Sequence, residues 1–218
     1  MSEWIQLGLA ALLTIGTGLF VASEFALVNT DRTELESRQQ DGEKNLRLPI
    51  MAVKRTSTHL SAAQLGITLT TLLTGFLAEP AISSLLSPWL TNFGLGENSV
   101  TVIGAVTALT VATLFSFLFG ELVPKNMALS VPVGTLKAVA FFQIGFTYLF
   151  YFIIIFFNNT GNFFVRRFGV EPKEELSSAR SAEELSSLVL RSASLGSLEE
   201  NTATLLSRTL RLSELSAT

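Results

Sequence analysis

The chain has 218 residues, of which 48% are hydrophobic and 15% are charged, and its net charge is −3. Soluble domains carry about 25% charged residues, whereas the mean hydropathy here is +0.46. This composition predicts an integral membrane protein and excludes an ordinary soluble domain. No basic stripe favours nucleic-acid binding, and the absence of cysteine excludes disulfides, thiolate metal sites and thiol catalysis.

The first apolar segment, residues 4–28, is long enough to cross a bilayer, since about 20 residues suffice. It has no basic residue before it and is longer than the apolar region of a signal peptide. Residues 31–55 are polar and include six lysines or arginines. They predict a solvated hairpin that is largely helical, with breaks at Gly42 and Pro49.

The second predicted span, residues 60–78, is rich in glycine and threonine, which allow close helix packing in lipid. Gln64 within it needs hydrogen-bond partners there. Residues 79–98 contain two prolines and no basic residue, and they predict an external connection with a short interfacial helix at 81–90, anchored by Trp89. Residues 100–119 form the third span and carry no charge.

The distribution of basic residues sets the predicted orientation. Because six lie in the first loop and none in the second, the N-terminus is expected outside, residues 31–59 inside and residues 79–98 outside. His59, the single histidine, is interpreted as an interfacial residue without a ligand role, since no second histidine or cysteine could complete a transition-metal site.

The third span ends in the sequence FGELVPK, residues 119–125. A carboxylate near hydrocarbon should face a protein interior or a wet cavity, so Glu121 either serves function or forms a structural ion pair with Lys125. Gly120 permits a close approach, and Pro124 removes a backbone donor and leaves carbonyls without their usual partners. An acid beside freed carbonyls suits a cation.

In the predicted orientation three polar clusters fall at one depth, near the cytoplasmic face. They are Ser23 with Glu24, residues 64–68, and Gly120 with Glu121. This convergence predicts a cation site built from all three spans.

Residues 138–157 are apolar and aromatic, but a full fourth crossing would place Arg166, Arg167 and Lys173 outside. We therefore expect a re-entrant or steeply bent element, with a fourth span as the alternative. We assign residues 1–170 to a transmembrane domain and residues 171–218 to a cytoplasmic linker that is helical in pieces.

Three motifs together resemble one known family. SEFALV at 23–28, QLGIT at 64–68 and GELVPK at 120–125 are similar to the signatures of the bacterial CorC/HlyC proteins, relatives of the CNNM (cyclin M) magnesium transporters. The resemblance implies an all-α domain of three spans with re-entrant and juxtamembrane helices, forming a homodimer in the plasma membrane. It also implies an ATP-binding CBS pair, which is absent here and would follow residue 218.

The resemblance further implies sodium-coupled magnesium export, with Mg²⁺ and secondarily Na⁺ as the bound ions. The implied metal-site residues are Ser23, Gly66, Thr68, Thr70, Gly120 and Glu121. The implied supporting residues are Glu24, Gln64, Pro124 and Lys125. Many relatives carry a serine at the position of Val21 or an asparagine at that of Ile67, so side-chain oxygens are fewer here.

Two other classes of function stay open at this point. One is a membrane-embedded cation sensor that moves nothing, and the other is a scaffold in which Glu121 pairs with a partner membrane protein. An enzyme is not expected, because no serine–histidine or paired-acid arrangement is visible.

Overall fold

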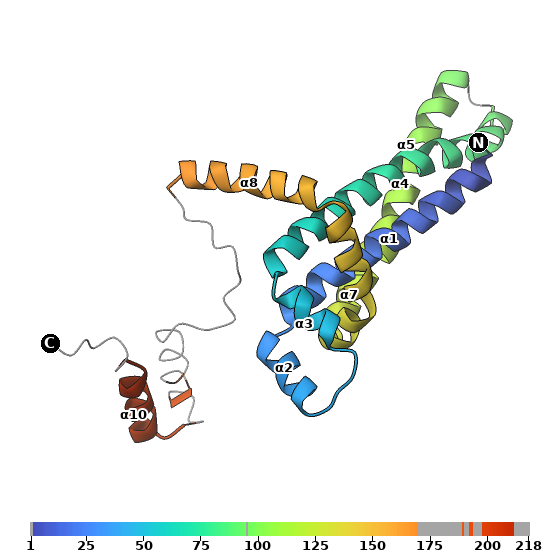
Figure 1. The fold of residues 1–218 in the computed structure, drawn as a ribbon. Helices are drawn as coiled ribbons and strands as arrows, with labels where there is room; N and C mark the ends of the chain where they lie inside the picture. Colours follow the sequence, from blue (N-terminus) through green and yellow to red (C-terminus); the bar gives the residue numbers. More distant parts are fainter. Residues whose placement is uncertain (1, 95, 170–188, 190–191, 194–197, 212–218) are drawn as a thin grey trace. The chain divides into compact units, whose positions relative to one another are not determined.

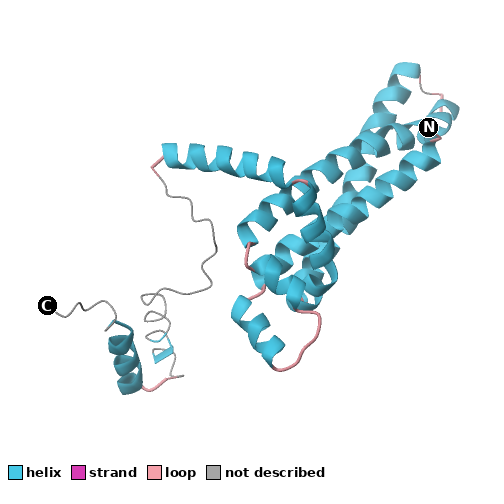
Figure 2. Ribbon diagram, in the orientation of Figure 1, coloured by secondary structure: helices cyan, strands magenta, loops and turns pink. Residues whose placement is uncertain are grey.

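The computed structural model describes residues 2–94, 96–169, 189, 192–193 and 198–211, and every regular element in these ranges is a helix (Figures 1 and 2). Met1–Leu176 and Ser177–Thr218 are two separate compact units. The second unit contains α10 (Glu200–Arg211). The predicted helical linker over 171–218 otherwise lies outside the described residues.

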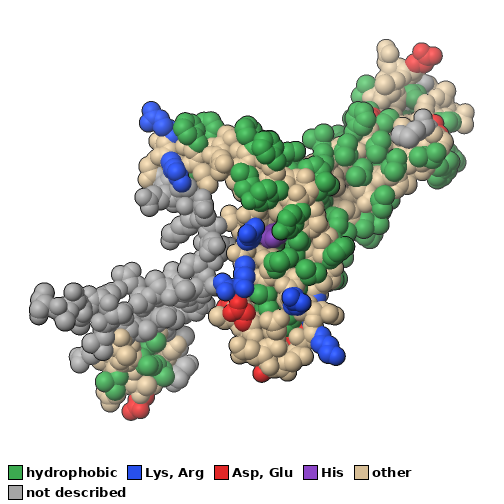
Figure 3. Space-filling view, in the orientation of Figure 1, with side chains coloured by type: hydrophobic (Ala, Val, Ile, Leu, Met, Phe, Trp, Pro, Cys, Tyr) green, Lys and Arg blue, Asp and Glu red, His purple; other side chains and the backbone are tan. Residues whose placement is uncertain are grey.

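Among the described residues, three stretches of helix are long and apolar enough to cross a membrane, as predicted, or four if the bent pair over residues 132–167 counts as one span. They are α1 (Glu3–Asn29), α4 (Thr56–Asn92) and a stretch from Glu97 to Ser130. The third consists of α5 (Glu97–Phe115), the π-helical η1 (Ser116–Leu122) and α6 (Val123–Ser130). Figure 3 shows apolar side chains along these helices, with Lys and Arg gathered toward the opposite end from the N-terminus.

The predicted end of the second helix near residue 78 is wrong, whereas the external location of residues 79–98 stays a prediction. Helix α4 continues unbroken through Pro80 and Pro88, so no separate interfacial helix exists at 81–90. Neighbouring helices can compensate for a proline in a membrane helix, and here the extension packs on the start of α1 and on α5. Ser84 donates a hydrogen bond to Glu3 over 3.4 Å, and Ala81 is fully buried.

The polar segment after α1 is a hairpin whose polar side is exposed, as predicted, and whose apolar side packs on the domain. Helices α2 (Arg32–Gln40) and α3 (Arg47–Val53) bury Leu35, Leu46 and Ile50 in a cluster with α6 and α7. The break at Gly42 is confirmed by a φ of +89°. Pro49 does not break α3, because it lies in the first turn, where its missing N–H has no helical partner to lose.

The aromatic segment forms two helices, α7 (Pro132–Leu149) and α8 (Tyr151–Arg167). They are bent by 78° where they meet, and Figure 1 shows α8 turning away from the bundle. The return of this bent pair to the cytoplasmic side stays a prediction.

Small residues bring α1 and α4 together. In lipid, helices associate by close packing because the surrounding tails are as apolar as leucine. The buried positions recur every three or four residues on both helices, so each presents one small-residue face. They are Ala10, Thr14, Thr17, Gly18, Ala22 and Ala26 on α1, and Ala62, Gly66, Thr70, Thr74, Ala78 and Ala81 on α4.

The tightest contact on this face is the Phe20 ring against Gly66. A Cβ on Gly66 would lie 2.5 to 2.6 Å from three ring carbons of Phe20. The ring cannot swing away easily, because it also packs on Phe142 and Phe146 of α7, with centroids 4.8 and 4.5 Å away. Gly66 is therefore required by packing.

We predict that Gly66→Ala destabilises the domain. The new methyl group overlaps a ring that is held from the other side, and overpacking of this kind costs about 1–3 kcal/mol. Thermal unfolding of the purified protein in detergent measures the loss.

Gly8→Ala is the matched control, because nothing lies within 4 Å of a Cβ at that position. It should leave stability unchanged or slightly raised. Combining Gly66→Ala with Phe20→Leu should recover part of the loss, and equal melting temperatures for Gly66→Ala and Gly8→Ala would contradict the packing account.

A second prediction concerns the ion pair that ties the α2–α3 loop to α7. Lys137 donates a hydrogen bond to Glu43, and this bond lowers the pKa of the Glu43 carboxyl below its ordinary value. A carboxyl whose pKa is lower in the folded state than in the unfolded state stabilises the fold at pH values above its unfolded-state pKa. This contribution is lost as the pH falls through the folded-state pKa.

We therefore expect wild type to melt above Glu43→Gln at pH 7, with the difference disappearing as pH falls below the ordinary glutamate pKa of about 4.3. Lys137→Gln should reproduce this pH dependence, since it removes the other partner. A difference that persists unchanged at pH 3 would contradict the assignment.

Candidate cation site between the spans

The turn that carries Glu121 is π-helical, and Pro124 explains why. A proline lacks the N–H that would bond the carbonyl four residues earlier, which is that of Gly120, and its ring crowds that carbonyl. The helix widens instead over Ser116–Leu122, and the Val123 N–H bonds the Leu118 carbonyl, five residues back. Such π-helical turns occur frequently at functional sites.

Two glycines let α1 approach this turn closely. A Cβ on Gly18 would lie 3.0 Å from Pro124 Cγ and 3.4 Å from the Phe119 carbonyl oxygen. Gly120 in turn lies against Thr14, since a Cβ on Gly120 would be 3.4 Å from the Thr14 carbonyl oxygen. The widened turn is thus held directly against the backbone of α1.

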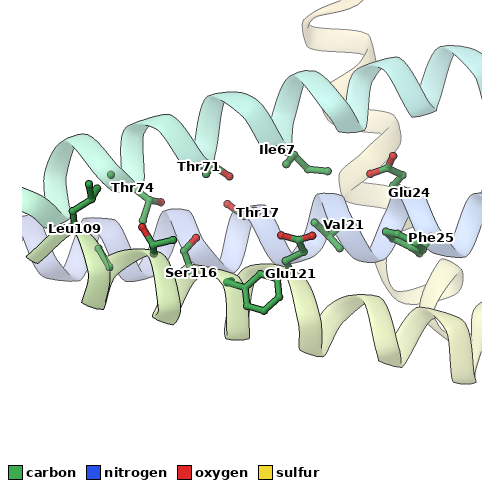
Figure 4. A pocket seen from close by; sticks show the side chains of 14 residues that line it. Thr17, Val21, Glu24, Phe25, Ile67, Thr71, Thr74, Leu109, Ser116 and Glu121 are labelled. Atoms are coloured by element: carbon green, nitrogen blue, oxygen red, sulfur yellow. The ribbon is translucent and has the colours of Figure 1, made fainter. Parts of the chain in front are cut away.

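A cavity of about 360 Å³ opens between α1, α4 and the α5–η1 helix. Figure 4 shows side chains from all three helices around one space. The wall is formed by Thr17, Val21, Glu24, Phe25, Ile67, Thr71, Thr74, Gly75, Leu109, Ala112, Thr113, Ser116, Phe117 and Glu121.

The charge in this cavity comes from Glu24 and Glu121. Within the described part of the chain, neither carboxylate makes a hydrogen bond or an ion pair. Lys125 does not neutralise Glu121, because its ammonium lies over the Phe25 ring, 4.7 Å from the centroid. The structural ion pair considered from sequence is therefore absent among the described residues.

Hydroxyl groups supply the other polar atoms. Thr17 of α1 bonds Thr70 of α4 over 2.8 Å, and Thr70 donates to the Gly66 carbonyl over 2.8 Å. Thr74 lines the cavity with its buried Oγ1 unpartnered. Ser116 adds a hydroxyl from the π-helical turn. The cavity therefore joins two carboxylates with several hydroxyl groups.

The sequence-predicted residues divide into two sets. Glu24 and Glu121 line the cavity, whereas the other candidates are not among its lining residues. Ser23 is fully buried with an unpartnered Oγ, and Thr68 is exposed and donates to the Gln64 carbonyl over 2.9 Å.

The remaining candidates shape the site. Gly66 is covered by the Phe20 ring, Gly120 packs on α1, and Pro124 contacts Gly18. Thr70 holds α1 to α4 through its hydroxyl. The ligand roles assigned to Ser23, Gly66, Thr68, Thr70 and Gly120 stay predictions.

Sequence reasoning missed five hydroxyl residues in the wall, namely Thr17, Thr71, Thr74, Thr113 and Ser116. A signal for them exists in the helical spacing of the lining positions, which recur at three or four residues on each helix. These positions are 17, 21 and 24 on α1, 67, 71 and 74 on α4, and 109, 113 and 116 on the third.

Val21 and Ile67 both line the cavity. These are the two positions at which the resemblance described above implied fewer side-chain oxygens. The structure thus places both departures directly in the wall, where they leave an apolar surface beside the acids.

The arrangement suits a hard cation that takes only a few ligands from the protein and keeps water as the others. No group of three or more His, Cys, Asp or Glu that could hold a metal lies among the described residues. Mg²⁺ prefers oxygen ligands and commonly keeps several waters, binding through one or two carboxylates. Two acids, nearby hydroxyls and space for water match that chemistry.

The sequence matches the family described as "Cyclin M transmembrane N-terminal domain" over residues 8–202. This chain belongs to that family. One similar protein is the UPF0053 protein MT1890 of Mycobacterium tuberculosis, which is 42% identical over 94% of this chain and 45% of that protein. Another is the UPF0053 protein YrkA of Bacillus subtilis, which is 32% identical over 90% of this chain and 45% of that protein.

A third relative of this cyclin M domain is the uncharacterized protein Rv1841c of Mycobacterium tuberculosis, 36% identical over 94% of this chain and 58% of that protein. The chain therefore spans about half the length of these relatives. The match confirms the resemblance to CNNM-related bacterial proteins, and it covers all three helices that line the cavity.

We predict that Glu121 and Lys125 are not energetically coupled. Because Lys125 lies over Phe25 and not beside the carboxylate, the effects of Glu121→Gln and Lys125→Gln on the free energy of unfolding should add within about 0.5 kcal/mol. Unfolding of both single variants and the double variant in SDS measures this.

Thr17→Val and Thr70→Val provide the positive control, since these two hydroxyls share a hydrogen bond. Their coupling should be near the average of about 0.6 kcal/mol for such bonds in membranes. A larger coupling between Glu121 and Lys125 than between the two threonines would restore the ion-pair interpretation.

Proposed function

We propose that this chain is the ion-translocating membrane domain of a magnesium transporter, with sodium-coupled Mg²⁺ export as its activity. The observation that supports this most directly is Glu121, an unpaired acid on a π-helical turn that faces a hydroxyl-lined cavity between the three spans. An ionisable residue inside a membrane domain generally marks an ion pathway. Membership of the cyclin M domain family supports the same activity.

In this proposal Mg²⁺ is the transported substrate, and Glu121 supplies the main attraction for it. Glu24 contributes a second negative charge from α1, and Ser116 and Thr71 offer hydroxyl oxygens from the other two helices. Because Mg²⁺ sheds water reluctantly, a cavity of about 360 Å³ favours a partly hydrated ion. Na⁺ could occupy the same oxygens with less charge.

The proposed moving part is the π-helical turn. Its backbone comes close to α1 at Gly18 and Gly120, where neither glycine has a side chain to interlock with the other helix. A small shift of η1 along α1 would move the Glu121 carboxylate relative to Glu24 and change which side of the membrane the cavity faces. Sodium re-entry would then drive the return.

Several further assignments belong to the same proposal. The domain would lie in the plasma membrane with its N-terminus outside and its C-terminal side cytoplasmic, and it would act as a homodimer. An ATP-binding CBS pair would follow it in the complete protein. The basic residues of the α2–α3 segment support the orientation, because six of them precede α4 and none lies between α4 and α5.

The test compares wild type with Glu121→Gln, both for Mg²⁺ binding by titration calorimetry and for Mg²⁺ flux in proteoliposomes. The substitution keeps the side-chain size and removes the charge. We expect the affinity for Mg²⁺ to fall at least about tenfold, because loss of even an outer-shell partner of a metal costs that much. The Mg²⁺ flux should fall with it. Added Na⁺ should weaken Mg²⁺ binding to wild type.

Glu97→Gln is the matched control, since Glu97 lies in the first turn of α5 and outside the cavity wall. It should retain both binding and flux. Unchanged affinity and flux in Glu121→Gln would overturn the proposed site. Glutamate-dependent binding without any flux in wild type would instead favour a cation sensor.

A further inference from the structure

A second site lies on another side of the domain, where the N-terminal end of α4 meets α7 and α8. Two cavities of about 590 and 530 Å³ open there. They share Arg55, Thr58 and Tyr151 in their walls and so adjoin each other, and together we call them the α4–α8 groove. Each part has the volume of a small-molecule site. None of the residues assigned to the cation site lines it.

The groove is positively charged. Lys54 and Arg55 line it, both side chains are exposed, and no carboxylate is among its described lining residues. Neither cation forms an ion pair within the described ranges. Arg32 and Arg38 nearby in sequence, by contrast, pair with Glu36 and Glu34. The groove therefore holds two cations without an internal counterion.

The helix that begins at the groove adds to this potential. Helix α4 starts at Thr56 and has 37 residues, and no side chain caps its first turn. Ser57 and Thr58 of that turn line the groove. The first N–H groups of a helix carry partial positive charge and favour phosphate groups.

A buried polar network forms the wall behind the cations. His59 Nδ1 and the Thr147 hydroxyl share a hydrogen bond of 2.8 Å, and both residues line the groove. Gln143 is fully buried and donates to the His59 carbonyl over 2.8 Å, while its Oε1 is unpartnered. The interfacial role expected for His59 is thus a buried one, and it fixes α4 against α7.

The position and the apolar rim of the groove identify its surroundings as lipid. Lys54 and Arg55 immediately precede the membrane-crossing helix α4, and Tyr148 and Tyr151 belong to the residue types that favour membrane interfaces. Leu149 and Phe152, on either side of the bend, are 77% and 85% exposed. Met51 and Ile144 give the groove itself an apolar part.

From these observations we infer that the α4–α8 groove binds the phosphate headgroup of an anionic phospholipid. Lys54, Arg55 and the first turn of α4 meet the phosphate, and the acyl chains run over the exposed apolar side chains at the bend. Basic pockets between membrane helices on the cytoplasmic side bind such headgroups in general. A soluble phosphate has no acyl chains and would leave the exposed apolar side chains at the bend uncovered. This site does not depend on the proposed transport activity, although its place on the cytoplasmic side rests on the orientation proposed above.

The test is native mass spectrometry of the detergent-purified protein, titrated separately with phosphatidylglycerol and phosphatidylcholine. Wild type should prefer phosphatidylglycerol. The double variant Lys54→Gln/Arg55→Gln should bind it about 30-fold more weakly, or about fivefold for each cation removed, with phosphatidylcholine binding unchanged. Lys54→Gln alone should lower the affinity for phosphatidylglycerol about fivefold. Because Lys54 is exposed, this single variant keeps the test valid if the double variant misfolds.

Lys44→Gln/Arg47→Gln is the matched control, because it removes the same charge from exposed positions that do not line the groove. It should keep the preference for phosphatidylglycerol within about twofold, the scatter of a surface charge change. Equal losses in the two double variants would show diffuse surface attraction and overturn the site. Displacement of the lipid by an equal concentration of glycerol phosphate would overturn the lipid assignment in favour of soluble phosphate.

Discussion

The close approach of α1 to α4 and to the π-helical turn is the constraint on which the rest of this domain depends. In lipid, helices gain little from burying apolar side chains, so they must pack at short range to stay together. Gly66 accepts the Phe20 ring, and Gly18 accepts Pro124. A larger residue at either position would push against its neighbour and disturb the packing that shapes the cavity between the helices.

This packing has a chemical consequence for Glu121. The same proline that widens the turn also contacts Gly18, so the feature that interrupts regular hydrogen bonding is held in place by the helix it faces. The carboxylate is then supported by backbone geometry and not by an ion pair, since Lys125 lies over Phe25. An unpaired acid in such a setting is available to a transported cation, in agreement with the proposed function.

The cation site and the α4–α8 groove differ in sign and in construction. The first joins two carboxylates to hydroxyls between the spans, whereas the second joins two unpaired cations to tyrosines and an apolar rim. Helix α4 contributes to both, with its first turn in the groove and Ile67, Thr71 and Thr74 in the cavity wall. The two proposals thus place cation recognition and anion recognition at different points along one helix.

The sequence by itself determined the class of protein, the three spans and the coincidence of Glu121 with Pro124, because each depends on composition or local order along the chain. Glu24 was placed at the depth of Glu121 from its position in its span, and in the structure both residues line one cavity. Only the tertiary structure decided that α4 continues past Pro80, that the α2–α3 hairpin is packed, and that Thr17, Thr74 and Ser116 face the acids. Depth in a membrane follows from position in a span, whereas the rotation of each helix about its axis is fixed by contacts such as Phe20 on Gly66, which join residues far apart in the chain.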